Sequence, residues 1–378
     1  MSILISLLFF LIILELSIGL IVNRYKKIKW LITNIDAIKL IDKRKFNKFK
    51  RENYNFELGW DKKRNTKNID LIKNNKILYS IDKKGFRKSR YNKKKNTIST
   101  FGDSYAFCRQ VKDSQTWQEL ISKDYNQFIS NYGVGNYGLD QAYLKFKKIN
   151  SNKTEKIVIF CFVPETICRI QSSWKNYLEF GNLHAFKPYC ILKNNKLVIK
   201  RNPLKPINVF KDLKNIINQI KINDRFYKEK YLKHYLKTPF ILSFFKNINF
   251  NLNIFFQILN YKKIKNIDVM NYKLFPIVMK HNILNSHNLY NETKSKKILE
   301  LLINKIDKDV LKKKKKCIFL IIPQLFDLKL QSNSNYQSYF KNLNKKFNII
   351  DTTENFKKLN NFEKIYIDDK YGGHLNKN

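Results

Sequence analysis

The sequence predicts an α/β fold with a mainly parallel sheet, preceded by one N-terminal membrane helix. Apolar runs of strand length, Ile157 to Val163 and Cys317 to Ile322, have the composition of strands buried on both faces. Periodic helical segments lie between such runs, and this alternation is typical of βαβ units. A hydrophobic content of 43% in 378 residues is enough for one large or two modest domains.

The net charge of +44 raises the question of a nucleic-acid partner. Only ten of the 74 basic residues are Arg, the residue suited to bidentate phosphate contacts, and no nucleic-acid-binding motif occurs. We therefore expect no nucleic acid, whereas attraction to anionic lipid or acidic polysaccharide stays open. The five Cys residues form no C-x-x-C pair, so we expect no metal, no cofactor and no disulfide framework.

Residues 1–25 are predicted to be a single-pass transmembrane anchor. Ile3 to Val22 is almost continuously apolar and has the length that spans a bilayer, with Glu15 as its one charge. A cleaved signal peptide is the alternative, but it would need a basic segment before the run and small residues at a cleavage site. Basic residues directly after the span place the body on the cytoplasmic side by the positive-inside rule. The extracytoplasmic side stays open, because Lys is abundant throughout.

Residues 26–95 form a basic, irregular lead-in. Its distinctive pieces are Phe56 to Trp60 and Gly85-Phe86-Arg87, with Gly59 and Gly85 at turns. Two interpretations are equally compatible with this stretch: a segment that packs on the domain, or a solvated linker with local aromatic residues.

The α/β domain is predicted over residues 96–378, with its strands and helices in alternating order. Its predicted strands begin with Thr97 to Gly102 and Gln127 to Asn131, continue with Ile157 to Val163 and Cys317 to Ile322, and end with Phe347 to Asp351 and Ile365 to Ile367. The helices predicted between them are Thr116 to Tyr125, Leu139 to Ile149, and Tyr336 to Leu343.

Residues 191–311 are predicted to be a mostly helical insertion. Leu204 to Tyr227 and Phe240 to Tyr261 have helical patterns, and Ile298 to Leu311 has the clearest one. The insertion could shape a substrate cleft, or it could only cover the sheet.

Ser104 lies where the first predicted strand turns toward a helix. This position is at the carboxyl end of a sheet, where open α/β folds bind ligands, and near spare helix N–H groups. Gly102-Asp103-Ser104 taken alone is also compatible with an ordinary turn capped by Asp103.

A nucleophilic serine needs a base and an orienting acid. His374 lies on a C-terminal loop, with Asp369 five residues before it and two glycines between them. The turn from Gly133 to Gly138 follows a strand and opens a helix, so its N–H groups could stabilise an oxyanion. The alternatives are an idle surface histidine and a plain glycine turn. A dinucleotide fingerprint fits poorly, since no acidic residue ends a strand about 20 residues later.

These three segments, in this order, resemble the GDSL-like, or SGNH, hydrolase superfamily. The similarity is greatest to membrane-anchored members that have bacterial surface-polysaccharide functions, and it includes Gly85-Phe86-Arg87. It covers roughly Phe56 to Val163 and Cys317 to Asn376, but not the insertion. The resemblance implies a flavodoxin-like three-layer α/β/α fold. By position it implies Ser104 as nucleophile, His374 as base, Asp369 as its orienting acid, and an oxyanion hole from Ser104 with Gly135 or Asn136.

The sequence departs from the family pattern at two places. The family's third oxyanion donor is an Asn after the third strand, where this chain has Val163-Pro164-Glu165-Thr166. An ionised Glu165 cannot donate a hydrogen bond, so Thr166 is the candidate third donor. The family's Asp lies three residues before the His, where this chain has Tyr371.

The resemblance implies a serine esterase or O-acyl (acetyl) transferase that acts on an acylated glycan or a related small ester through an acyl-enzyme. The alternative is a catalytically inactive, membrane-anchored module of the same fold that binds polysaccharide or an assembly partner. A lysine-rich nucleic-acid binder is the weakest interpretation.

Overall fold

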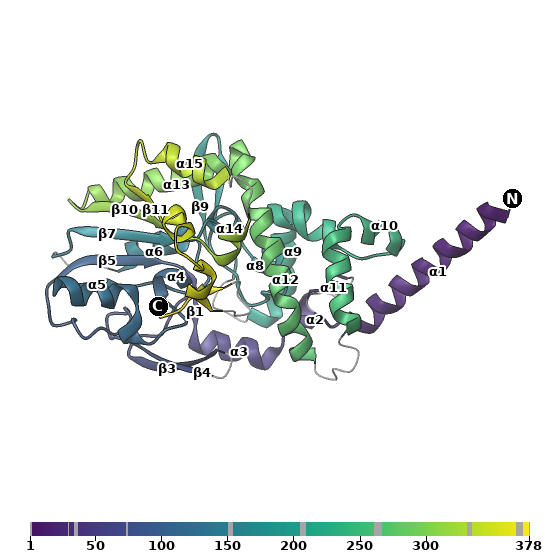
Figure 1. The fold of residues 1–378 in the computed structure, drawn as a ribbon, viewed down its shortest axis with the longest axis horizontal. Helices are drawn as coiled ribbons and strands as arrows, with labels where there is room; N and C mark the ends of the chain where they lie inside the picture. The colour runs from purple at the N-terminus through teal and green to yellow at the C-terminus, as the bar shows by residue number, and fades with distance from the viewer. Residues whose placement is uncertain are drawn as a thin grey trace.

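In the computed structural model, a central five-stranded sheet forms the body of the chain, and helix α1 projects from one end (Figure 1). The structure describes residues 2–28, 30–33, 37–72, 75–149, 154–204, 209–260, 267–330, 335–367 and 373–377. Its strands lie in the order β11-β10-β7-β5-β6, and every neighbouring pair is parallel. The strands are β5 (Asn96–Gly102), β6 (Phe128–Asn131), β7 (Ile157–Phe162), β10 (Lys316–Ile321) and β11 (Ile349–Asp351).

The predicted α/β fold with a parallel sheet is confirmed. Numbered along the chain, the five strands have the order 2-1-3-4-5, which is that of flavodoxin-like doubly wound sheets. The order reverses between β5 and β7. Ligands of such sheets bind at this switch point, beyond the carboxyl ends of the strands.

Aromatic side chains build the core on one face of the sheet. Phe101, Phe160 and Phe319 are register partners on adjacent strands, with ring centroids 5.8 and 6.0 Å apart. The helices of this layer contribute buried side chains to the same cluster. They are α6 (Leu139–Lys148), α13 (Thr293–Leu311) and α15 (Asn335–Leu343).

A smaller apolar cluster covers the other face. Tyr105, Cys161 and Ile322 belong to it, and Trp117 and Phe356 pack against it from nearby helices. The elements on this side are α4 (Ser104–Phe107), η1 (Asp113–Gln115), α5 (Trp117–Tyr125), α14 (Leu325–Lys329), α16 (Thr353–Lys357), η5 (Phe362–Ile365), β12 (Tyr366–Ile367) and β13 (His374–Leu375).

The lead-in is more regular than predicted, and it packs on the domain. Leu58, Trp60 and Phe86 belong to the main core, which favours a docked segment over a solvated linker. Its hairpin was not predicted because abundant Lys masks the alternation of Ile77, Tyr79 and Ile81. The elements are α2 (Ala37–Leu40), α3 (Lys43–Glu52), β1 (Tyr54–Asn55), β2 (Gly59–Trp60), β3 (Thr66–Ile72) and β4 (Asn75–Ile81).

A long connection leads from β7 to β10. It contains the antiparallel hairpin β8–β9, which the prediction of a mostly helical insertion missed. It also contains α12, which was not predicted because Pro276 and scattered Asn residues interrupt the apolar pattern. The elements are α7 (Thr166–Arg169), α8 (Lys175–Leu178), β8 (Tyr189–Lys193), β9 (Lys196–Lys200), α9 (Val209–Asn223), η2 (Tyr227–Tyr231), η3 (Leu232–His234), α10 (Phe240–Phe245), α11 (Ile248–Asn260), α12 (Ile267–Asn288) and η4 (Leu289–Asn291).

Helix α1 (Ser2–Tyr25) is long and apolar enough to cross a membrane. Its first half projects from the body, whereas Ile18 and Val22 are buried in a second core together with side chains of α10, α11 and α12.

Candidate active site

The turn after β5 places Ser104 at the switch point of the sheet. Gly102 is required there, because a Cβ atom on it would lie 1.8 Å from the carbonyl oxygen of Cys161. Asp103 caps the short helix α4, since its Oδ1 accepts a hydrogen bond from the Tyr105 N–H at 2.9 Å. Ser104 is therefore the first residue of α4, directly beyond the carboxyl end of β5.

Asp103 also connects this turn to the neighbouring strand. Its Oδ2 accepts a hydrogen bond from the Val163 N–H at 3.0 Å and lies 3.5 Å from Arg169 Nη1. Burial raises the pKa of Asp103, and the positive charge of Arg169 opposes that rise. The carboxyl group thus links the turn after β5 to the end of β7.

Arg87 of the lead-in holds the other end of α4. Its Nη1 donates to the carbonyl oxygens of Phe107 and Cys108, both at 2.6 Å, and its Nε donates to Asp113 Oδ1 at 2.7 Å. These carbonyls at the end of α4 receive no bond from within such a short helix. The Gly85-Phe86-Arg87 segment therefore supports the helix that begins with Ser104.

His374 reaches Ser104 from the C-terminal end of the chain. The two side chains are buried, and His374 Nε2 lies 2.9 Å from Ser104 Oγ. Strand β13 pairs His374 with Ile367 of β12. Tyr105 holds the imidazole of His374 in place. The centroids of the two stacked rings are 5.1 Å apart, and the Tyr105 hydroxyl donates to the Gly373 carbonyl oxygen at 2.6 Å.

The loop after β6 brings backbone donors to the same place. Gly133 is packed so closely on α4 that a Cβ atom would lie 2.3 Å from the Phe107 nitrogen, and its N–H donates to Asn131 Oδ1. Among the described residues, no hydrogen bond occupies the N–H groups of Ser104, Gly135 or Asn136. These three residues and His374 line one cavity of about 90 Å³.

Asn136 has a left-handed backbone with a φ of 70°. The buried Lys175 stabilises it, because its Nζ donates to the side-chain oxygen of Asn136 and, at 3.4 Å, to its carbonyl oxygen. Burial lowers the pKa of Lys175, and the neighbouring Glu179 opposes this shift. The buried Lys175 thus holds the donor loop in place.

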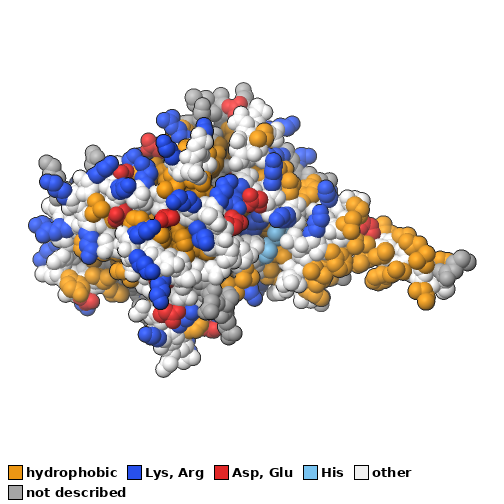
Figure 2. Space-filling view, turned by 90° about the horizontal axis from the view of Figure 1, so that it is seen from above, with side chains coloured by type: hydrophobic (Ala, Val, Ile, Leu, Met, Phe, Trp, Pro, Cys, Tyr) orange, Lys and Arg blue, Asp and Glu red, His pale blue; other side chains and the backbone are white. Residues whose placement is uncertain are grey.

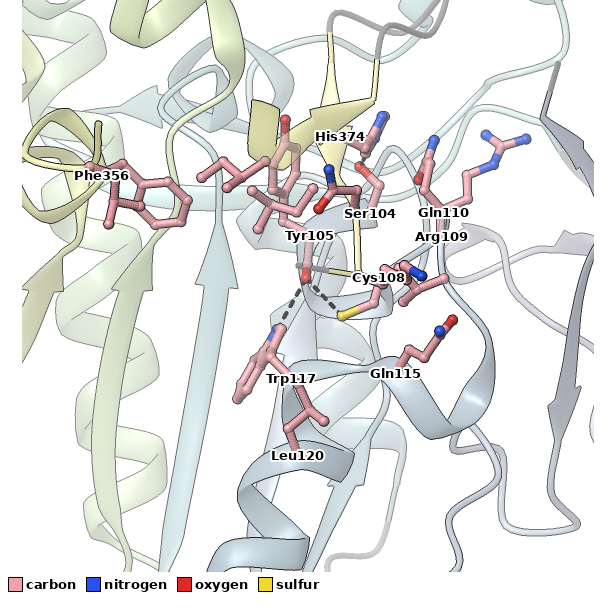
Figure 3. A pocket seen from close by; sticks show the side chains of 16 residues that line it. Ser104, Tyr105, Cys108, Arg109, Gln110, Gln115, Trp117, Leu120, Phe356 and His374 are labelled. Carbon is pink, nitrogen blue, oxygen red and sulfur yellow. Dashed lines mark hydrogen bonds between the residues drawn. The ribbon is translucent and has the colours of Figure 1, made fainter. Parts of the chain in front are cut away.

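A second, larger cavity also borders the Ser104–His374 pair. It has a volume of about 410 Å³, and Figure 3 shows Ser104 and His374 side by side at its edge. Its walls are mostly apolar and include Trp117, Leu120 and Phe356. This volume lies within the range of small-molecule sites.

Cys108 lies in the same wall but is a poor nucleophile. Desolvation raises the pKa of its thiol to about 11, and its Sγ donates to the Tyr105 carbonyl at 3.4 Å. At neutral pH the sulfur therefore carries its proton, so Ser104 is the stronger candidate.

Thr166 does not lie where the prediction of a third oxyanion donor requires it. The Thr166 hydroxyl accepts a hydrogen bond from the Leu139 N–H at 3.0 Å, and Thr166 does not line either cavity beside Ser104. Glu165 Oε2 accepts from Arg169 Nη2 at 2.5 Å, and burial raises the pKa of Glu165.

Arg169 is the residue that the sequence analysis missed. It lines the 90 Å³ cavity, and its buried Nε has no hydrogen-bond partner among the described residues. The only available signal was its spacing of four residues from Glu165, which suits an ion pair on one helical turn.

The predicted orienting acid, Asp369, lies outside the described residues. The sequence matches no model of a known protein family, and a search of the curated proteins finds no match.

Proposed function

We propose that this chain is a serine esterase or O-acyltransferase of the SGNH type, anchored to a membrane by α1. The observation that supports it most is the 2.9 Å separation of Ser104 Oγ and His374 Nε2 beside unoccupied backbone N–H groups. A serine, a base within hydrogen-bond reach and oxyanion donors are the groups that acyl transfer needs.

In the proposed mechanism, His374 Nε2 takes the hydroxyl proton as Ser104 Oγ attacks the acyl carbonyl. The N–H groups of Ser104, Gly135 and Asn136 stabilise the developing oxyanion in the 90 Å³ cavity. The protonated His374 then gives its proton to the leaving alcohol, and the acyl group stays on Ser104 as an ester. Water or a sugar hydroxyl, deprotonated by His374, takes the acyl group and frees Ser104.

Two further residues complete this proposal. Asp369 is the proposed partner that orients the imidazole, as in the family pattern. Arg169 is the proposed third oxyanion donor in place of the family's Asn. Its buried Nε–H makes no hydrogen bond among the described residues, with Glu179 Oε1 3.8 Å away, and its side chain lines the same cavity.

The two cavities suggest how an ester would lie. The carbonyl oxygen enters the small cavity with the N–H donors, and the acyl chain lies in the apolar cavity beside Trp117. An acylated glycan remains the proposed substrate on the strength of the family resemblance. The apolar volume of about 410 Å³ supports acyl groups larger than acetyl.

The proposal is tested with a series of p-nitrophenyl acyl esters from acetyl upward, using the full chain in detergent. Ser104→Ala should lower turnover at least about 10³-fold, the loss typical of a removed triad nucleophile. Ser338→Ala is the matched control, since Ser338 is exposed on α15 and should leave turnover unchanged. If the wild-type chain hydrolyses no ester but binds acylated polysaccharide, the inactive binding module is the correct interpretation.

A further inference from the structure

The part of α1 whose side chains are exposed on every side is too short to cross a bilayer alone. Side chains are exposed from Ser2 to Ile13, a length of about 18 Å at 1.5 Å per residue. A hydrocarbon core is about 30 Å thick. The missing thickness matches the next turns of α1, from Leu14 to Val22. One face of these turns packs against the body through Ile18 and Val22, while Leu16 and Leu20 on the other side are 61% and 71% exposed.

Helix α10 packs directly on this part of α1, and α11 packs on α10 in the same apolar core. Glu15 accepts hydrogen bonds from the N–H groups of Phe240 at 2.6 Å and Ile241 at 2.8 Å, at the start of α10. The Phe240 ring lies against Gly19, where a Cβ atom would be 3.1 Å away. Glu15 lies about 10 Å along α1 from Val22, the last residue of the apolar run. Because Glu15 contacts the first residues of α10, α10 begins at a depth that lies within this apolar run.

This contact also explains the one charge in the apolar run. An unpaired carboxylate inside a membrane is costly, and groups of this kind are retained when they have partners. Here both carboxylate oxygens accept backbone N–H groups that the first turn of α10 would otherwise leave unsatisfied. Glu15 therefore links α1 to the start of α10, and the two segments lie at the same depth.

The outer surfaces of α10 and α11 carry large apolar side chains, next to the exposed Asn249, Asn253 and Asn260 of α11. Leu242, Phe245 and Phe256 are 65%, 51% and 60% exposed, respectively. In a chain with 28% charged residues, the stretch from Thr238 to Tyr261 has a single charge, Lys246. Figure 2 shows that hydrophobic side chains cover the projecting α1, while Lys and Arg are spread over much of the remaining visible face.

From these observations we infer that α10 and α11 are embedded in the bilayer leaflet that α1 enters, with their exposed apolar side chains against lipid chains. The lipid surface is the occupant because this apolar face is continuous with the candidate membrane span.

Helix α12 connects this membrane face to the candidate active site. It packs in the same core as α10 and α11, and its Phe275 and Met279 line the 90 Å³ cavity with Ser104. The embedded helices thus hold the catalytic cavity near the membrane surface. The inference takes α1 to lie in a bilayer, as proposed above, but it does not depend on esterase activity.

The test uses depth-dependent fluorescence quenching on the full chain in phosphatidylcholine–phosphatidylglycerol vesicles. Leu242→Cys, Phe245→Cys and Phe256→Cys each carry a fluorophore, and the lipids carry spin labels on their acyl chains. Ile350→Cys is the matched control, because Ile350 is 50% exposed on β11 of the sheet. The unsubstituted chain measures the background from its native thiols, of which Cys108 is the most exposed.

We expect lipid spin labels to quench the three α10–α11 fluorophores several-fold more than the fluorophore at position 350, and iodide in the water to show the opposite order. Equal quenching at all four positions would overturn the inference. Phe9→Cys tests the anchor separately, since Phe9 is 65% exposed on the projecting part of α1. A quenched label at position 9 with unquenched labels on α10 and α11 would leave the anchor intact and the inference wrong.

Discussion

At the scale of single residues, the site depends on one contact between distant parts of the chain. Ser104 and His374 are 270 residues apart in sequence, and their reactive atoms are 2.9 Å apart. Their residue types and positions could be read from the sequence, since a serine after a strand and a late histidine are local features. The roles of Arg87, Tyr105 and Arg169 could not, because each depends on a partner that only the fold brings near.

Substitution of two glycines at the site, Gly135 and Gly102, should distinguish an effect on catalysis from an effect on stability. A Cβ atom at Gly135 meets nothing within 4 Å, and Gly135 lines the oxyanion cavity. The backbone N–H stays in Gly135→Ala, but the added methyl group would take space in the cavity that receives the substrate carbonyl. We therefore predict that this variant lowers kcat/KM for esters about 10²-fold, as large as the loss of one oxyanion contact, with the unfolding temperature unchanged. Steady-state kinetics and thermal unfolding measure the two effects.

Gly102→Ala is the contrasting variant. Its Cβ atom would overlap the Cys161 carbonyl oxygen at 1.8 Å, so β5 and β7 would have to move apart. This variant should lose at least about 3 kcal/mol of unfolding free energy.

Full activity in Gly135→Ala would show that Gly135 does not border the reacting carbonyl.

At the scale of elements, the sequence predicted the parts whose signal is local. The five sheet strands and the helices α5, α6, α13 and α15 follow from apolar runs and helical periodicity, within a few residues at their ends. The hairpins β3–β4 and β8–β9 and helix α12 were missed. In these elements Lys, Asn or Pro residues break the pattern, and burial against other elements supplies the stability instead.

Two histidines make the helical connection sensitive to acid. His234 and His281 face each other with ring centroids 4.7 Å apart, and Phe250 packs on both. Burial lowers the pKa of His234 to about 4 and that of His281 to about 2, and the nearby charge of Lys230 adds to both shifts. Both side chains are therefore neutral in the folded protein at neutral pH.

Because both pKa values are lower in the folded than in the unfolded chain, unfolding takes up protons below about pH 6.5. We predict that stability falls as the pH drops through this window, by about 2 kcal/mol per histidine between about pH 7 and pH 5. Thermal unfolding followed by circular dichroism in detergent measures this loss. His234→Gln/His281→Gln should flatten the dependence, and a wild-type unfolding temperature that is constant over this range would contradict the prediction.

At the scale of the whole molecule, the chain joins a second apolar core, which includes part of α1, to a doubly wound α/β body. The second core contains Ile18 and Val22 of α1 together with side chains of α10, α11 and α12, and α12 reaches the 90 Å³ cavity beside Ser104. No sequence pattern predicts this arrangement, because it depends on long-range contacts. One example is the hydrogen bond that Glu15 accepts from Phe240 at the start of α10, 225 residues away. The excess of Lys over acidic residues is spread over the body and does not mark the site.

The central claim is that Ser104 is a nucleophile activated by His374, and labelling with a serine-directed fluorophosphonate tests it most directly. The full-length wild-type chain should gain one label, located on Ser104 by peptide mass. Ser104→Ala should gain none, and His374→Ala should label far more slowly because the base is lost. A wild-type chain that stays unlabelled, or a Ser104→Ala variant that labels as fast as wild type, would contradict the account.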